Sequence, residues 1–270
     1  MKLSCVTASY VADLLGYPGQ IDWGWAMKTI EGAPMLETLD GILTRLAPAR
    51  LDGLEIWYPH ASPRNLTPAL ASEVRRRLAA QGMVCCACAG SVGDPVQDPY
   101  GCEEAFQTAC LLQAPLIAGH LHAGTASQLG RMAARFGIRL AYENGPEKDV
   151  SEILSAIEGS NEKEAKVATT DWVAANLDTG NMAAQGGDPV QAIRVLGRRV
   201  MHVHLKDVPA VGSHQCVAIG TGIVDVEGVF RELKACGYDG WLSIEIETGD
   251  HDPTEEILAS AETIRRLWGR

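Results

Sequence analysis

The sequence predicts an α/β fold, and within that class a (β/α)8 TIM barrel that forms a single domain over residues 1–270. Three observations support this prediction. The length of 270 residues is close to the roughly 250 residues that are usual for such a barrel. Short apolar segments alternate with helical patterns, as in a parallel sheet. Four of these segments end in a side chain able to bind a metal, and barrels carry their functional groups at the C-terminal ends of strands.

The expected strands are short runs rich in apolar residues. In chain order they are Lys2–Thr7, Gly53–Trp57, Met83–Ala89, Ala114–His120, Arg139–Glu143, Val173–Asp178, Val200–Leu205 and Trp241–Glu247.

Helical patterns, with apolar residues at spacings of three and four, lie between most of these strands. Gly82 and Gly237 occupy positions where helix C-caps are expected. The clearest helices are Pro68–Gln81, Glu103–Leu112, Val226–Gly237 and Thr254–Trp268, and the stretch Ala123–Ile138 is long enough for one more. Because neither an interdomain linker nor a further repeat interrupts this order, we expect one domain.

Composition excludes some classes of partner. The net charge of −11 and the pI near 5.1 argue against nucleic acid, whose affinity for proteins comes mostly from Lys and Arg. No apolar run reaches the ~18 residues of a membrane span, and the N-terminus lacks a signal-peptide pattern. We therefore expect a cytoplasmic protein with a small-molecule substrate and no membrane or nucleic-acid partner.

The eight cysteines are scattered and show no zinc-finger spacing. Cys85, Cys86 and Cys88 cluster inside an apolar run. Metal binding is one interpretation of this cluster, but small buried thiols that pack as hydrophobic side chains are the expected one. Disulfides are not expected in the cytoplasm.

The residues that end the four strand-like segments are Glu143, Asp178, His204 and Glu245. Any one of them could be a strand-end group that pairs with a loop, but four in register predict one site. Three carboxylates and one imidazole form an oxygen-rich set that suits Mn, Mg or Co better than Zn. The hypothesis is a single catalytic divalent ion.

The same segments resemble a known family. LAYEN around Glu143, NLDTGN around Asp178, HVHLKD around His204 and GWLSIEIE around Glu245 look like the metal-binding strands of the xylose-isomerase-like TIM-barrel superfamily of sugar isomerases and epimerases. The segment Ile219–Asp225 and the return through GYDGW are similar to the loop that leads into the family's last strand. The resemblance covers the C-terminal half strongly and residues 1–110 only by their rhythm.

In the ketose 3-epimerases, hydroxypyruvate isomerases and inosose dehydratases of that superfamily, the matching residues hold one ion that the substrate chelates. The resemblance implies that Glu143 and Glu245 also move a proton next to the substrate carbonyl, through an enediolate that the ion stabilises. The expected activity is that of a metal-dependent isomerase or epimerase of a small sugar or keto-sugar. The alternatives are a lyase or dehydratase that acts on a keto-inositol or 3-keto-glycoside, and a barrel that binds a ligand without turnover.

Departures from the family pattern narrow this interpretation. The DNA-cutting endonuclease branch has a His three residues after the Asp, where this chain has Asn181, and His214 lacks the preceding Asp of that branch. The ketose epimerases carry an Arg soon after the His, whereas here the nearest basic group is Lys206. HVHLKD is closer to the inosose dehydratase pattern.

Six further residues are candidates for substrate binding: Lys206, His120, His122, His60, Trp25 and Glu247. Each has an alternative role. Lys206 could form an ion pair with Asp207 or a loop carboxylate, and Glu247 could support Glu245. The three histidines could be ordinary solvated or packed residues.

Trp23 and Trp25, in the first loop, could either close off the substrate or pack on the first helix. His202 is interpreted as an interior residue or as one that supports a ligand, and not as a ligand itself. Gly220 and Gly222 form only a weak G-x-G, and no phosphate, nicotinamide or flavin motif is present. Related barrels are often dimers or tetramers, so a homo-oligomer is an option, but the sequence identifies no interface.

Overall fold

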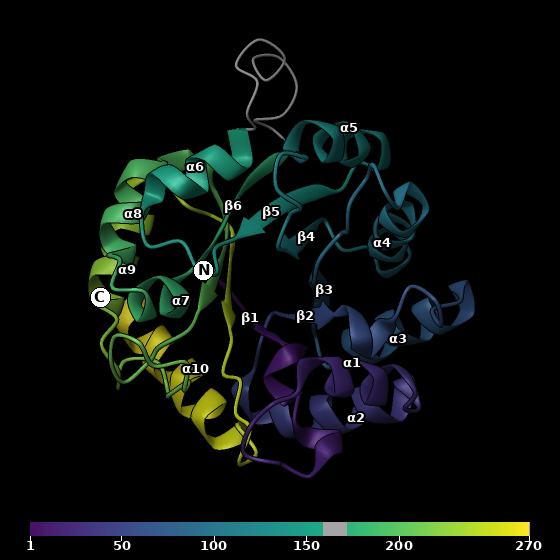
Figure 1. Cartoon of the computed structure of the whole chain (residues 1–270). Helices are drawn as coiled ribbons and strands as arrows, with labels where there is room; N and C mark the ends of the chain where they lie inside the picture. The colour runs from purple at the N-terminus through teal and green to yellow at the C-terminus, as the bar shows by residue number, and fades with distance from the viewer. Residues whose placement is uncertain (159–171, 270) are drawn as a thin grey trace.

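Eight parallel strands close into a barrel in the computed structural model, which describes residues 1–158 and 172–269 (Figure 1). Each strand pairs with its neighbours in chain order, and the first pairs with the last. The strands are β1 Lys2–Val6, β2 Gly53–Trp57, β3 Val84–Ala89, β4 Leu116–Gly119, β5 Arg139–Glu143, β6 Val173–Asp178, β7 Val200–Leu205 and β8 Trp241–Ile244. The predicted fold class is therefore confirmed.

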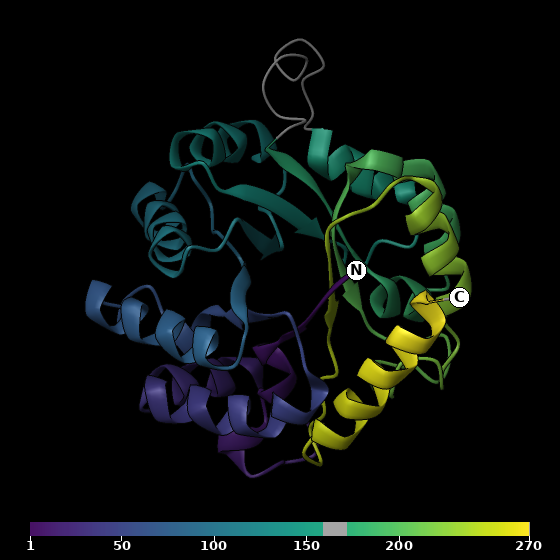
Figure 2. The same ribbon diagram turned by 180° about the vertical axis from the view of Figure 1, so that it is seen from behind.

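Helices surround the barrel, as Figures 1 and 2 show from opposite ends. They are α1 Trp23–Glu31, α2 Met35–Leu46, α3 Pro68–Ala80, α4 Pro99–Leu112, α5 Ala126–Phe136, α6 Val150–Glu158, α7 Thr179–Ala184, α8 Pro189–Leu196, α9 Val226–Ala235 and α10 Thr254–Trp268. The ring closes where α10 packs against both α9 and α2. The short helices α1 and α7 precede α2 and α8 in their β-α units. None of the helices within the described ranges is long and apolar enough to cross a membrane.

The predicted helices begin and end where local chemistry requires. Helix α4 starts at Pro99, earlier than the predicted Glu103, because Asp98 accepts a hydrogen bond from the Gly101 amide at 2.9 Å and proline suits the first helical position. Gly82 and Gly237 both have a φ of +73° just after α3 and α9. This left-handed conformation is typical of a glycine at a helix C-terminus, so the positions predicted for these two glycines are confirmed.

The barrel interior changes from apolar to polar along the strands. Near the N-terminal strand ends, side chains including Leu116 and Ala141 pack with the partly buried Trp241. Toward the C-terminal ends, polar groups such as Asn176 and Ser243 are fully buried. All eight cysteines are free thiols, and Cys85, Cys86 and Cys88 are buried. For this cluster, packing as small buried thiols is thus favoured over metal binding.

Two irregularities in strand register fix which side chains enter the interior. Between β6 and β7 the pairing steps from Ala175–Val200 to Asn176–His202, which leaves Met201 as an extra residue. Between β2 and β3 a similar step leaves Cys86 extra. Such bulges redirect the side chains that follow them. His202 and His204 therefore share the interior face of β7, as strand alternation predicts.

Phe106 on α4 tests the packing of the helical ring. Its ring is fully buried and stacks on Phe136 of α5 at a centroid distance of 5.3 Å. We expect Phe106→Ala to lower the free energy of unfolding by about 3 to 5 kcal/mol because it leaves a cavity. Urea denaturation would measure this change. Tyr100→Ala on the same helix, where the side chain is 80% exposed, should change stability by less than about 0.5 kcal/mol; equal effects would contradict the packing described.

Candidate metal centre

The four strand-end residues of the sequence hypothesis converge at the C-terminal end of the barrel. Glu143 and Asp178 end β5 and β6, His204 lies near the end of β7, and Glu245 directly follows β8. One ligand atom from each lies within 4.8 Å of those of the others. Although β8 ends at Ile244 and not at Glu247 as predicted, the Glu245 amide still donates to the Leu205 carbonyl. The chain therefore stays beside β7 long enough to hold Glu245 in the cluster.

His204 is the central member of this cluster. Its Nδ1 lies 3.3 Å from Glu143 Oε1 and 3.1 Å from Glu245 Oε2. Its side chain is 1% exposed, as is expected of an imidazole held by partners on several sides. Burial opposes protonation, yet the carboxylates of Glu245, Glu55 and Glu143 raise the pKa of His204 well above its ordinary value. The site is electrostatically suited to a cation.

Asp178 is oriented by the turn that follows β6. Its Oδ1 accepts a hydrogen bond from the Asn181 amide at 2.8 Å and caps α7. The side chain of Asn144 bonds the backbone N–H and C=O of Asp178 at 2.9 and 3.0 Å. Among the described residues, Asp178 Oδ2 and Glu245 Oε2 are buried and have ion-pair contacts with Lys206 as partners in place of a regular hydrogen bond. One oxygen of Asp178 thus anchors the helix and the other faces the cluster.

Lys206 supplies a positive charge next to these carboxylates. Its Nζ lies 3.2 Å from Asp178 Oδ2, 3.0 Å from Glu245 Oε2 and 3.1 Å from Glu247 Oε2. Of the two roles considered from the sequence, an ion pair is observed, but its partners are these three carboxylates. Asp207 instead accepts hydrogen bonds from the amides of Gly220 and Gly222 at 2.9 Å. These glycines are turn residues, as predicted.

The backbone around Lys206 is fitted to this position. The Thr179 hydroxyl donates to the Lys206 carbonyl at 2.7 Å and accepts from its amide at 3.1 Å. A Cβ on Gly180 would lie 2.5 Å from Lys206 Cγ, so a glycine is required there for the close approach of the two segments. Sequence reasoning missed Thr179 and Asn144, because both act only through the backbone of a neighbouring strand.

Burial and charge shift the pKa values of these groups in opposite directions. Burial raises the pKa of Asp178 and that of Glu247 to about 7, although Lys206 opposes both shifts. Burial disfavours the ammonium of Lys206, but Asp178, Glu245 and Glu247 raise its pKa above the ordinary value. Burial would likewise raise the pKa of Glu245, yet Lys206 and His204 hold it below its ordinary value. The centre therefore carries more acidic groups than its own cations neutralise.

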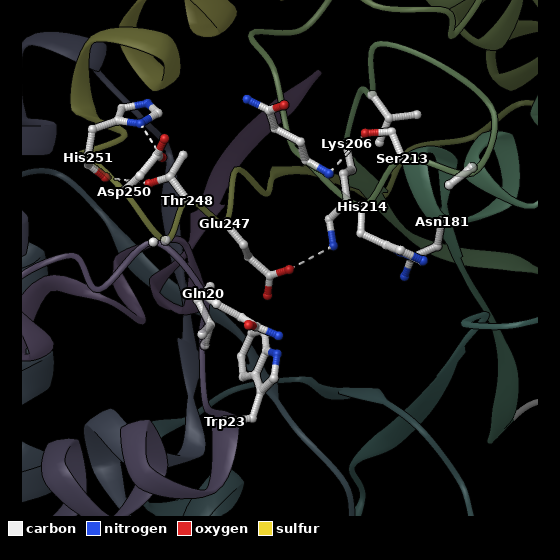
Figure 3. Close-up of a pocket in the computed structure, with 16 residues that line it drawn as sticks. Gln20, Trp23, Asn181, Lys206, Ser213, His214, Glu247, Thr248, Asp250 and His251 are labelled. Carbon is white, nitrogen blue, oxygen red and sulfur yellow. Dashed lines mark hydrogen bonds and ion pairs between the residues drawn. The ribbon is translucent and has the colours of Figure 1, made fainter.

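Two cavities adjoin at this centre. The first, which we call the metal-side cavity, has a volume of about 580 Å³. It is lined by Glu143, His204 and Glu245 and has an aromatic wall that includes Trp57 and Tyr58. The second, which we call the polar cavity, has a volume of about 600 Å³. It is lined by polar side chains: Gln20, Asn181, Ser213, His214, Gln215, Glu247, Thr248, Asp250 and His251. Trp23, Asn181, Lys206 and Glu247 line both. Figure 3 shows Lys206 and Glu247 pointing toward one another in the wall of the polar cavity, where they form an ion pair.

The other histidine candidates occupy different surroundings. His120 lines the metal-side cavity, and its Nδ1 lies 2.9 Å from the Glu143 carbonyl oxygen. His122 is 57% exposed and pairs with Asp94 at 3.4 Å, outside both cavities. His60 is buried under the ring of Trp57 and lines neither cavity. Of these three histidines, only His120 lines a cavity in which it could contact a bound substrate.

Of the two tryptophans in this segment, Trp23 lines the cavities and Trp25 does not. The segment predicted as a loop begins helix α1, because Asp22 accepts a hydrogen bond from the Trp25 amide at 2.9 Å. Residues two apart on a helix do not share a face. Trp23 therefore contacts Trp57 edge to face and lines both cavities, whereas Trp25 is 52% exposed and lines neither.

Glu55 is a further residue of the site that the sequence did not reveal. It lies in the middle of β2, is fully buried, and contacts His202 and His204. Glu55, His202 and His204 form the second group of side chains with metal-ligand spacing among the residues that the structure describes. The only sequence signal was a charged residue inside an apolar strand.

The segment from residue 125 to residue 267, more than half of the chain, matches the family model described as xylose isomerase-like TIM barrel. The protein belongs to this family. The resemblance inferred from the four strand motifs is therefore confirmed, including its concentration in the C-terminal half.

Known relatives in this family include the inosose dehydratase of Geobacillus thermodenitrificans, which is 28% identical over 163 residues, covering 53% of this chain and 52% of that protein. The rhizopine catabolism protein MocC of Rhizobium meliloti is 28% identical over 146 residues, covering 48% of this chain and 42% of that protein. The chain thus matches about half the length of these relatives.

Solved structures extend the likeness over the whole chain. The probable 3-DHS dehydratase AsbF of Bacillus anthracis has a TM-score of 0.71 at 16% identity and covers 98% of this chain and 99% of its own. A D-tagatose 3-epimerase-like protein has a TM-score of 0.70 at 16% identity and covers 100% and 97%. At these identities the likeness shows the fold alone.

Replacement of Lys206 tests the charge balance of the centre. We expect Lys206→Met to lower the free energy of unfolding of metal-free protein by about 3 to 5 kcal/mol, because it leaves buried carboxylates without their cation. Added Mn²⁺ should then raise the Tm of the variant more than that of the wild type, as thermal unfolding would show. Arg194→Met, which removes a 56% exposed partner of Glu232, should cost about 0 to 1 kcal/mol. A Lys206 variant as stable as this control would contradict the assignment.

Because His60 is buried, we expect the protein to become less stable in acid. Burial lowers the pKa of His60 to about 4, so below the ordinary His pKa of about 6.5 the unfolded chain binds a proton that the folded protein refuses. This linkage should remove about 2 kcal/mol of stability between pH 7 and pH 5. Urea denaturation at both pH values should show that His60→Gln lowers this pH-dependent loss by about that amount. An unchanged pH dependence in the variant would show that His60 is not the responsible group.

Proposed function

We propose that this protein is a divalent-metal-dependent enzyme that removes the proton next to the carbonyl group of a small keto-sugar or keto-polyol. The observation that carries the proposal is the convergence of Glu143, Asp178, His204 and Glu245 around one point that opens into a cavity. A binding-only barrel has no need for several acidic groups in such close contact, because their mutual repulsion costs stability.

The residues fit a metal ion. Glu143, Asp178, His204 and Glu245 would hold it, and three carboxylates with one imidazole suit Mn, Mg or Co. The buried oxygens Asp178 Oδ2 and Glu245 Oε2 already face the ammonium of Lys206 at 3.2 and 3.0 Å, so they are placed to accept a positive charge. When bound, the ion would polarise the substrate carbonyl and stabilise the negative charge that develops on its oxygen.

The proton transfer itself is assigned to Glu143 and Glu245. They come from different strands and face the same cavity, so one carboxylate can accept the proton from carbon while the other is available to return it. General acid or base catalysis of this kind contributes about 10² to 10⁴ in rate. Trp23, Trp57 and Tyr58 line the cavity and would exclude water from the reacting carbon.

After this proton is removed, we favour elimination of water from the neighbouring carbon. The C–H electron pair forms a double bond, the C–O bond breaks, and the leaving hydroxide takes up a proton to become water. Lys206 lines both cavities, where its ammonium can donate a hydrogen bond to the departing hydroxyl. The inosose dehydratases among the relatives support this outcome.

Isomerisation or epimerisation is the second candidate. It requires the same first step, and the two carboxylates of Glu143 and Glu245 supply the acid and the base for it. The sequence favoured this outcome, and several structures with the same fold carry epimerase names. The difference lies in whether a proton returns to carbon or a hydroxyl leaves.

The polar cavity supports a polyhydroxylated substrate. Gln20, Asn181 and Ser213 offer hydrogen-bond donors and acceptors around a volume of about 600 Å³. Because this cavity joins the metal-side cavity at Lys206 and Glu247, a 3-keto-glycoside with a second sugar unit fits as well as a single inosose ring. Both substrates belong in the test.

Incubation in D₂O with Mn²⁺ separates the alternatives. With inosose, 3-keto-glycosides and simple ketoses, we expect the wild type to exchange the proton next to the carbonyl. It should release water from inosose and the second sugar unit from a 3-keto-glycoside, and mass spectrometry detects both. Deuterium uptake without loss of either group would assign the protein as an isomerase or epimerase. Metal binding with neither reaction on any of these substrates would favour the ligand-binding barrel.

Glu143→Gln and Glu245→Gln should each slow deuterium exchange by about 10² to 10⁴, because an amide cannot accept the proton. Glu37→Gln, an exposed position on α2, is the matched control and should exchange as the wild type does. Exchange at the wild-type rate in either cavity variant would remove that residue from the mechanism.

A further inference from the structure

Glu55 lies beneath the candidate metal ligands as a buried carboxylate between two imidazoles. Its Oε2 is 2.7 Å from His202 Nε2, and its Oε1 is 3.0 Å from His204 Nε2. Because β1 and β8 separate β2 from β7 in the barrel, these contacts cross the interior. A charged group at 0% exposure is stable there only if its partners replace water.

His204 is held at both ring nitrogens. Its Nε2 faces Glu55, and its Nδ1 faces Glu143 and Glu245. A carboxylate can only accept hydrogen bonds, and a neutral imidazole carries its proton on one nitrogen. With an ion on the Nδ1 side, where no proton can remain, the contact with Glu55 would place the proton of a neutral His204 on Nε2. The lone pair of Nδ1 would then be directed at the point where Glu143 and Glu245 converge.

We propose that Glu55 is a positioning residue of the metal centre, which fixes the tautomer and orientation of His204 so that Nδ1 binds the ion. His202 has a supporting role: it donates to the second oxygen of Glu55 and packs against His204 edge to face, with ring centroids 5.4 Å apart. A carboxylate behind a metal-binding histidine also raises the basicity of the ligand. This inference rests on the proposed metal site.

The same three residues could instead be a second metal site, because their ligand atoms are closely spaced. Their separations favour hydrogen bonds. The 2.7 and 3.0 Å between Glu55 and the two histidines are the usual lengths of N–H···O contacts to a carboxylate. Each Glu55 oxygen already accepts one such contact, so we assign the cluster to positioning.

The first test compares metal affinities in a competition assay with a chromophoric chelator. Glu55→Gln keeps the size of the side chain but loses its charge, and its NH₂ group cannot accept a hydrogen bond from the second imidazole. We expect this variant to bind Mn²⁺ about 10- to 100-fold more weakly than the wild type.

Glu256→Gln is the matched control, because Glu256 Oε1 lies 2.8 Å from a histidine outside the centre, His251. Its affinity for Mn²⁺ should equal that of the wild type. Equal affinities in the wild type and Glu55→Gln would overturn the role of Glu55 and leave the metal site intact. A wild type that binds no Mn²⁺, Mg²⁺, Co²⁺ or Zn²⁺ would overturn the metal site and this inference together.

The second test needs no variant and applies even if Glu55→Gln does not fold. Long-range ¹H–¹⁵N correlation spectra of wild-type protein with ¹⁵N-labelled histidine, loaded with Mg²⁺ or Zn²⁺, report which ring nitrogen of His204 carries the proton. We expect a proton on Nε2 and none on Nδ1. A proton on Nδ1 would overturn the proposal.

Discussion

The concentration of negative charge at one end of the barrel is the constraint on which the centre depends. Asp178, Glu245 and Glu247 gather where burial penalises their charged forms, and Glu143 lies beside them against His204. Lys206 is the cation that faces three of them. Without a cation the carboxylates would repel one another, so the site is built to hold positive charge. The ammonium supplies part of that charge within the chain itself.

A second requirement is that the barrel interior carry this polar cluster without losing its packing. The bulge in β7 allows this, because the extra residue Met201 joins the apolar end while His202 and His204 face the polar end. The bulge in β3, at Cys86, lies opposite β2 just where Glu55 enters the interior. In strand pairs without these bulges, inward and outward side chains would alternate strictly, and fewer side chains would point into the barrel interior. The irregular register thus connects the local fold to the hydrogen bonds behind the site.

The sequence was sufficient for the order of strands and for the four candidate ligands, because both follow from apolar runs and the residues that end them. It was less informative about where pairing stops: the fourth strand was predicted as Ala114–His120 and is Leu116–Gly119, since hydrophobicity does not mark the last hydrogen bond. Glu55 could not be predicted, because its partners lie 147 and 149 residues later. Trp23 and Trp25 were both expected in a loop, and Trp25 was named as a substrate contact; a capped helix begins there instead, and Trp23 is the one that lines the cavities.

Lys206 and a divalent ion are compatible in one site, although both are attracted to the same carboxylates. Asp178 Oδ1 is committed to the helix cap, and its Oδ2 lies 3.2 Å from Lys206. Glu247 gives Lys206 a partner outside the candidate ligand set, at 3.1 Å and at the boundary of the two cavities. With an ion in the site formed by Glu143, Asp178, His204 and Glu245, Glu247 would remain as the partner of the ammonium. Lys206 would then remain beside the substrate as a hydrogen-bond donor, which is the position that elimination of a hydroxyl requires.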